Sequence, residues 1–322
     1  MVVQGSSLLA THTPPRHLTC FKTKPVGSVG NFMFMYAFLT GVCIHHGVSP
    51  FHCASMFFSP MPNSRKVKLM QFKKLFRLSS PPCPIPGPYF HDHDNLSEPY
   101  TIRFKPRVFD QPTGTTFLGF YQSFRYFSNP DAVRTIKHVF TPGKSRWLDG
   151  AQHLLAAQSE AKRLSSKLVG PVVCLSYLKF IPKHSFINSW TLSYDYYVAA
   201  IEEMQRRLGN STLLVLIPSV QDSGNNPSDS EEAAPENDLV KRICQRFNIS
   251  TAPSSVVEIG QAVYLDEVMT LHVLMSCPNL VLSPTSLSWW GAFLSGEFFL
   301  GFYTYVEFSL CPLTSFLLRF VL

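Results

Sequence analysis

Two segments of the 322-residue chain place glycine, amide and hydroxyl groups at the starts of expected helices. The first runs from Gly27 to Asn31 (GSVGN), and the second is the hydroxyl-rich turn within Leu282 to Leu294 (LSPTSLSWWGAFL). Backbone N–H groups at a helix start favour anions such as phosphate, and glycine lets the backbone approach a ligand closely. The residues that we expect to bind such a ligand are Gly30, Asn31, Ser283, Thr285 and Ser286.

Both segments also have a purely structural interpretation. Glycine followed by a capping Asn is common in a plain turn before a helix. Trp289 and Trp290 supply apolar area, so the second segment also suits a capped helix of the core. A third segment, Gly119 to Phe127, interleaves aromatic residues with Gln122 and Arg125, which suits either a sugar site or packing between domains.

Other groups of ionisable residues give weaker indications. His91-Asp92-His93-Asp94 lacks the i, i+4 spacing of a helical metal site and follows a Pro-rich stretch. It therefore favours a solvated loop, and no metal site is expected. The acidic residues of the helical segments show no spacing typical of an acid–base pair. We assign no catalytic and no acceptor-binding residue from the sequence.

The expected elements alternate between strand and helix from about residue 169. Strands are expected over 171–180, 211–217 and 280–282, and helices over 194–208, 239–247, 266–276 and 286–294. Short strands separated by helices are typical of a parallel sheet with helical crossovers. Such sheets bind ligands at the carboxyl ends of their strands.

The first half of the chain shows less regular patterns. Residues 1–24 are expected to be an irregular leader, 26–47 a turn followed by a helix, and 59–99 a Pro-rich loop. Helical patterns return over 130–141 and 150–168, and an acidic loop is expected over 221–238. The chain therefore divides into a first half of mixed pattern and a second half of regular alternation.

The composition excludes several classes of protein. Apolar residues make up 45% and charged residues 15%, whereas disordered chains combine low hydrophobicity with high charge. The formal net charge is +7, and six basic residues without an acid lie between Arg65 and Arg77. This concentration suits a solvated helix face, or contact with an anionic membrane or another polyanion. No nucleic-acid partner is expected.

The cysteine pattern gives information on zinc binding and on disulfides. None of the eight cysteines forms a C-x-x-C pair, which argues against zinc, and their spread argues against a dense disulfide framework. Cys174 and Cys277 lie in apolar stretches and are expected to be small buried hydrophobes.

Three N-x-[ST] sequons, at Asn95, Asn210 and Asn248, permit glycosylation in the secretory pathway. No signal-peptide pattern or N-terminal anchor is recognised. Residues 298–322 are apolar but contain charges, so they suit a poor membrane span or a buried chain ending.

Several motifs, in this order, resemble glycosyltransferase family 11, the galactoside α-1,2-fucosyltransferases. Gly27 to Ala37 is similar to the family's G-R-L-G-N-Q-[ML]-F-x-Y-A, and Gly119 to Phe127 to G-Y-F-Q-S-x-K-Y-F. Asp195 to Ile201 matches D-Y-Y-x-x-A-I, and Asp266 to Leu294 matches the late motif S-x-S-[TS]-F-S-W-W-x-A-x-L with the helix and strand before it. The resemblance covers about residues 26–47, 115–145 and 168–296.

The resemblance implies an α/β fold of the GT-B type, with two Rossmann-like domains that contain parallel sheets. After an irregular leader at 1–25, an N-terminal, acceptor-side domain with a Pro-rich insertion would span 26–165. A C-terminal nucleotide-sugar-binding domain would span 166–322. The implied reaction transfers fucose from GDP-fucose to a terminal galactoside with inversion, without a metal or another cofactor. The implied location is the Golgi membrane.

One family motif has no counterpart. The positions aligned with H-x-R-R-x-D are occupied by Cys174, Ser176, Tyr177 and Lys179. Arginine forks make bidentate, charge-assisted bonds to phosphate, which serine and tyrosine do not replace. We therefore add Lys179 to the expected donor-binding residues. The alternative is a catalytically inactive family member that binds a glycan or a protein partner.

Overall fold

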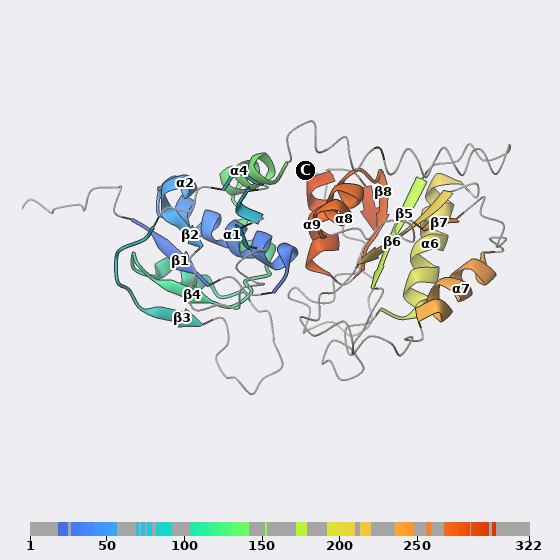
Figure 1. Cartoon of the computed structure of the whole chain (residues 1–322), viewed down its shortest axis with the longest axis horizontal. Coiled ribbons are helices and arrows are strands. Elements are labelled where there is room, and N and C mark those ends of the chain that lie inside the picture. The colour runs from blue at the N-terminus through green and yellow to red at the C-terminus, as the bar shows by residue number, and fades with distance from the viewer. Residues whose placement is uncertain are drawn as a thin grey trace, which may run out of the picture.

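Two parallel sheets form the framework of the computed structural model (Figure 1). The structure describes residues 19–24, 27–56, 69–70, 72–74, 76–78, 82–91, 104–141, 152, 172–178, 192–209, 213–219, 236–247, 256–258, 267–283, 285–295 and 298–300. Every strand pairing within this described part is parallel. The expected α/β class with two parallel sheets is therefore confirmed.

The first sheet has the strand order β2-β1-β4-β3. Its strands are β1 (Phe21–Thr23), β2 (Ala54–Met56), β3 (Tyr89–His91) and β4 (Thr116–Leu118). The helical elements of this half are α1 (Val29–His45), α2 (Pro50–Cys53), η2 (Pro106–Asp110), η3 (Phe124–Phe127) and α4 (Pro130–Phe140). Two expectations were wrong here, because β1 lies within the expected leader and β3 within the expected Pro-rich loop.

The second sheet has the strand order β7-β6-β5-β8-β9. Its strands are β5 (Val172–Leu178), β6 (Leu213–Ser219), β7 (Val256–Glu258), β8 (Asn279–Val281) and β9 (Phe298–Leu300). The helices between successive strands are α6 (Tyr194–Leu208), α7 (Glu236–Arg246), α8 (Glu267–Met275) and α9 (Ser286–Ser295). The strand order reverses between β5 and β8, which is where sheets of this kind bind ligands.

Helix α1 is buried almost throughout. All residues from Phe32 to Cys43 are buried, and a helix that is apolar on every side belongs in a core. Within the part of the chain that the structure describes, we find no helix with both the length and the hydrophobicity needed to cross a membrane.

Helices α8 and α9 lie between the two sheets (Figure 1). Their residues Leu271, Met275 and Trp290 belong to the same hydrophobic core as α1, η3 and α4. The Trp290 ring stacks on Phe127, with centroids 5.8 Å apart. Helices α8 and α9 of the second half therefore pack into the core of the first half. The expected domain boundary at 165/166 lies outside the described residues and stays a prediction.

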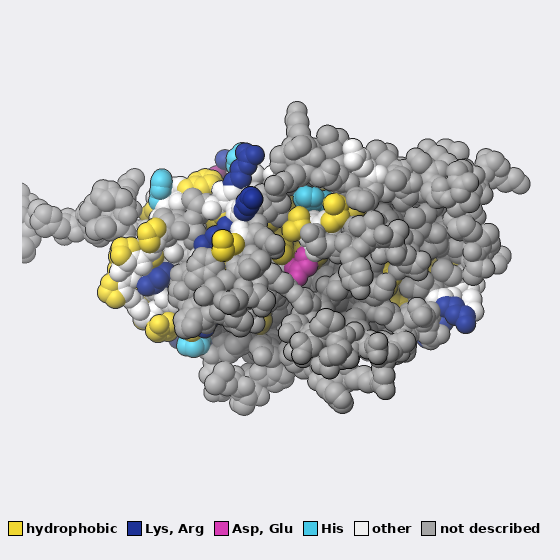
Figure 2. Space-filling model, viewed as in Figure 1, with side chains coloured by type: hydrophobic (Ala, Val, Ile, Leu, Met, Phe, Trp, Pro, Cys, Tyr) yellow, Lys and Arg dark blue, Asp and Glu magenta, His cyan; other side chains and the backbone are white. Residues whose placement is uncertain are grey.

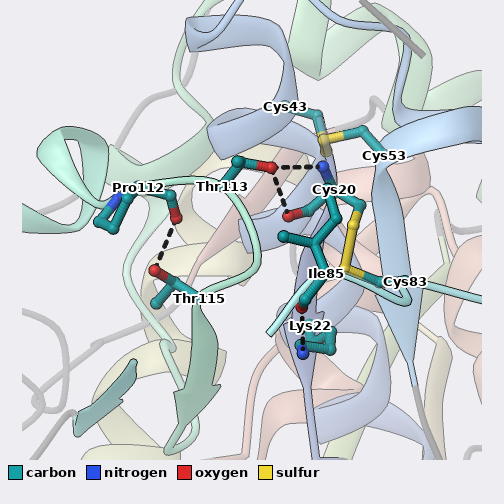
Figure 3. The surroundings of a disulfide bond; sticks show 9 residues. All are labelled: Cys20, Lys22, Cys43, Cys53, Cys83, Ile85, Pro112, Thr113 and Thr115. Atoms are coloured by element: carbon teal, nitrogen blue, oxygen red, sulfur yellow. Dashed lines mark hydrogen bonds between the residues drawn. A yellow bond between two sulfur atoms is a disulfide. The ribbon is translucent and has the colours of Figure 1, made fainter. Parts of the chain in front are cut away.

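Three disulfides join cysteines from different elements. Cys20–Cys83 and Cys43–Cys53 lie near each other in the first half, where the Lys22 ammonium also donates to the Ile85 carbonyl (Figure 3). The third bond joins Cys174 of β5 to Cys277, which lies two residues before the first residue of β8. Cys174 and Cys277 are buried, as expected. They are not simple hydrophobic side chains, however, because the pairing of β5 with β8 brings their sulfur atoms together in a disulfide.

Candidate functional site

The N-terminal ends of α1 and α9 meet between the two sheets. The Trp290 indole N–H donates to the Gly30 carbonyl over 3.1 Å. A Cβ atom at position 30 would lie 2.5 Å from the Ser286 hydroxyl oxygen and 2.6 Å from the Leu287 nitrogen. Glycine is therefore needed at position 30, and the two segments selected from the sequence form one place in the fold.

Asn31 connects this place to the third segment. The Gln122 side-chain N–H donates to the Asn31 amide oxygen over 2.5 Å. The backbone of Gly27 has φ +84°, a left-handed conformation that favours glycine. The turn before α1 thus places Asn31, which is half-buried, beside Gln122.

Four hydroxyl side chains form a chain of hydrogen bonds at the carboxyl ends of β5 and β8. The Ser176 and Ser283 hydroxyls lie 3.0 Å apart, and those of Ser283 and Thr285 lie 3.2 Å apart. Thr285 caps α9 by accepting from the Ser288 N–H over 3.1 Å. The Ser288 hydroxyl in turn accepts from the Ser283 N–H over 3.3 Å. The cluster sits where the strand order reverses, which is the ligand-binding edge of such a sheet.

Ser176 is a member of the site that the sequence analysis did not select. Val173, Leu175 and Tyr177 pack against α6, as buried members of one core cluster. Since side chains alternate along a strand, Ser176 lies on the opposite face, where it reaches Ser283. The alternation of side chains between the two faces of β5 was the pattern that could have identified Ser176. Lys179 lies outside the described residues.

A carboxylate already occupies the N-terminus of α1. The Val29 N–H donates to a Glu267 carboxylate oxygen over 2.6 Å. Glu267 is the first residue of α8, and negative charge is stabilised at a helix N-terminus. The helix end that was expected to face a ligand phosphate therefore holds a carboxylate from the other half of the chain. No local spacing indicates a contact between residues 238 positions apart.

The aromatic residues of the third segment are mainly core residues. Tyr121, Tyr126 and Phe127 are buried, and the Tyr121 ring stacks on Phe38 with centroids 3.9 Å apart. The packing interpretation of this segment is therefore correct for these three rings. Gln122 is the residue of the segment that reaches the site.

Tyr36 and Glu203 are two described residues whose pKa values are shifted strongly away from neutrality. Burial raises the pKa of Tyr36 to about 12, so its phenol stays neutral. Hydrogen bonds from Arg206 and Arg207 lower the pKa of Glu203 to about 2 on the surface of α6. Among the described residues, no three His, Cys, Asp or Glu side chains are grouped for a metal ion. His91 is exposed, while residues 92–94 lie outside that part.

Comparison with known proteins gives no match to a family model and none to a curated protein. Among solved structures, a FUT1 variant from Arabidopsis thaliana in complex with GDP is 7% identical, with a TM-score of 0.43 over 88% of this chain and 70% of that one. POFUT1 in complex with GDP is 10% identical, with a TM-score of 0.38 over 89% and 99%. POFUT1 in complex with GDP-fucose is 10% identical, with a TM-score of 0.33 over 87% and 95%.

Proposed function

We propose that the chain is a fucosyltransferase that transfers fucose from GDP-fucose to a terminal galactoside with inversion. The observation that carries the proposal is the convergence of three sequence segments with family-like motifs. Gly30, Asn31, Gln122 and Ser286 come together beside the Ser176–Ser283 hydroxyl pair. These groups lie at the ligand-binding edge of a parallel sheet.

The arrangement suits a nucleotide diphosphate as leaving group. The N-terminus of α9 lies there, and the positive end of a helix dipole stabilises negative charge. Groups fixed in place before the reaction stabilise developing charge in the transition state most effectively. We place the donor diphosphate against α9, beside the hydroxyls of Ser283, Thr285 and Ser286, with no metal ion. The galactoside would approach from the side of the first sheet.

We also propose that the protein acts at the Golgi membrane. Disulfides persist in oxidising compartments and are rare in the cytosol. The bonds Cys20–Cys83, Cys43–Cys53 and Cys174–Cys277 support maturation along the secretory pathway.

Binding of GDP tests the proposal directly. We expect calorimetry on the purified chain to detect GDP and GDP-fucose, and fucose transfer to lactose to release GDP. Exchanging both Ser176 and Ser283 for alanine removes a mutually bonded pair. Thr285, the other partner of the Ser283 hydroxyl, still accepts from the Ser288 N–H, so stability should change little. We expect GDP affinity to fall about tenfold, in line with the loss of one hydrogen bond to a charged group. A folded wild-type chain that does not bind millimolar GDP would contradict the proposal.

The carboxylate at α1 gives a second prediction. Glu267→Gln keeps an oxygen that accepts from Val29 but removes the negative charge beside the proposed diphosphate. Since like charges at close range cost on the order of 1 kcal/mol, we expect GDP to bind about fivefold more tightly. Glu202→Gln, at an exposed residue of α6, changes the net charge equally and should leave GDP affinity unchanged. Equal affinities for the wild type and Glu267→Gln would show that the carboxylate does not face the donor.

A further inference from the structure

The excess positive charge of the chain is concentrated in two stretches of sequence. Residues 57–78 and 130–150 together contain ten Lys and Arg but only two Asp and Glu. The whole chain has 28 basic and 21 acidic residues, so the remainder has 18 and 19 and is nearly neutral. A basic region against a neutral background indicates a localised electrostatic function.

The structure brings described parts of both stretches together. In the first stretch, Leu69, Phe72 and Phe76 are buried. The Phe76 ring lies 4.9 Å from Phe140, at the end of α4. The first stretch therefore packs against α4 through its apolar side.

The opposite side of the first stretch faces solvent. Met70, Lys74 and Arg77 are exposed. Met70 and Lys74 follow the i, i+4 spacing of one helical face, and Arg77 lies in the turn that follows, with φ +50°. Lys73, in contrast, is half-buried and donates to the Met56 carbonyl over 2.8 Å. The charges at positions 74 and 77 are thus presented outward.

Helix α4 adds further cations. Arg134 is exposed, and Lys137 is half-buried with its ammonium 5.4 Å from the centre of the Phe293 ring of α9. Asp131 is the acidic residue of this helix, and its contact with Arg134 is an exposed pair of little energetic value. We call Lys74, Arg77, Arg134 and Lys137 the basic surface. Figure 2 shows Lys and Arg side chains over α4 and just below it.

The side chains around the basic surface indicate which kind of polyanion it binds. An interfacial helix inserts several large apolar side chains into a membrane, whereas Met70, 62% exposed, is the one large exposed apolar residue of the described parts of these two elements. Single-stranded nucleic acids stack on exposed aromatic rings, but Phe72, Phe76 and Phe140 are buried. Clusters of Lys and Arg are typical of heparin-binding patches, and the disulfides indicate an oxidising, secretory compartment.

We propose that the basic surface binds a sulfated polysaccharide. This inference goes beyond the proposed transferase activity, because the surface does not include the residues placed at the donor. The same protein would thereby carry a second glycan-binding site, selective for sulfate groups. Lys137 places one edge of this surface beside α9.

Heparin is the probe, titrated into the full chain at 0.15 M NaCl with heparin stripped of its sulfates as the reference. We expect binding to heparin alone, weakening steeply as salt screens the charges. The double exchange Lys74→Glu and Arg77→Glu should weaken binding at least tenfold. The matched control is Lys241→Glu with Arg246→Glu on α7, which changes the net charge equally at exposed residues and should have little effect.

Four results would overturn the inference. These are no binding of wild-type chain to heparin, equal binding to the desulfated form, equal weakening by both double variants, and binding to anionic phospholipid vesicles but not to heparin. Circular dichroism of both variants checks that they fold like the wild type. GDP affinity, measured on the same samples, should be unchanged, so failure here is separable from failure of the proposed transferase.

Discussion

Removing the Cys174–Cys277 disulfide is expected to lower the free energy of unfolding by about 5 kcal/mol. The bond spans 103 residues, and the chain-entropy model assigns about 5 kcal/mol to a loop of that length. It also ties β5 to the start of β8, the two strands that carry Ser176 and Ser283. We therefore expect the double exchange of Cys174 and Cys277 for alanine to weaken GDP binding as well. Urea unfolding followed by far-ultraviolet circular dichroism measures the stability change.

The Cys43–Cys53 bond provides the matched control. Its loop spans 10 residues, for which the same model gives about 3 kcal/mol. Both cysteines are fully buried, as are Cys174 and Cys277. Exchange of Cys43 and Cys53 for alanine should therefore cost less and leave GDP affinity unchanged. Equal costs for the two pairs would contradict the loop-length argument.

Exchange of Trp290 for alanine is expected to cost about 3–5 kcal/mol, the range found for large aromatic residues in cores. The Trp290 side chain is fully buried. Its ring lies 5.0 Å from Phe34 and 5.2 Å from Phe140, and its N–H binds the Gly30 carbonyl. Folded proteins are stable by only about 5–15 kcal/mol, so this single change removes a large fraction of the total. Denaturant unfolding provides the measurement.

Two further variants separate the contributions of this residue. Trp290→Phe keeps an aromatic ring and loses the hydrogen bond to Gly30, so we expect a cost nearer 1–2 kcal/mol, roughly that of an unpaired buried carbonyl and lost area. Trp289 is only half-buried, and Trp289→Ala should cost less than Trp290→Ala. If Trp289→Ala proves the more destabilising, Trp290 is not the residue that anchors α9 in the core of the first half.

The second sheet was more predictable than the first. Strands β5 and β6 are seven residues long and are separated by an amphipathic helix, so their pattern is visible in the sequence. Strands β1, β2, β3 and β4 have three residues each, which is too short to establish a period of two. Their order also depends on pairings between distant residues, such as Lys22 with Thr116, that no local pattern specifies.

The site was predictable where a helix start and a turn share one short segment. Gly30, Asn31 and Ser286 were selected on that basis, and the structure brings them together. Glu267 and Ser176 were missed because each acts through a partner more than 100 positions away. The pairing of the cysteines could not be predicted from the sequence either, since the number of possible pairings grows steeply with the number of cysteines.

The packing of α8 and α9 into the core around α1 limits how the two sheets can move apart. An enzyme with two separate cores can open by a hinge between them, as many transferring enzymes do when a lid or domain closes. Here such a hinge would have to withdraw Trp290 from Phe34, Phe127 and Phe140. The two sheets should therefore unfold in one calorimetric transition. Under the proposed function, we expect the donor to enter by a local displacement near the N-terminus of α1, where the Val29 N–H donates to the Glu267 carboxylate.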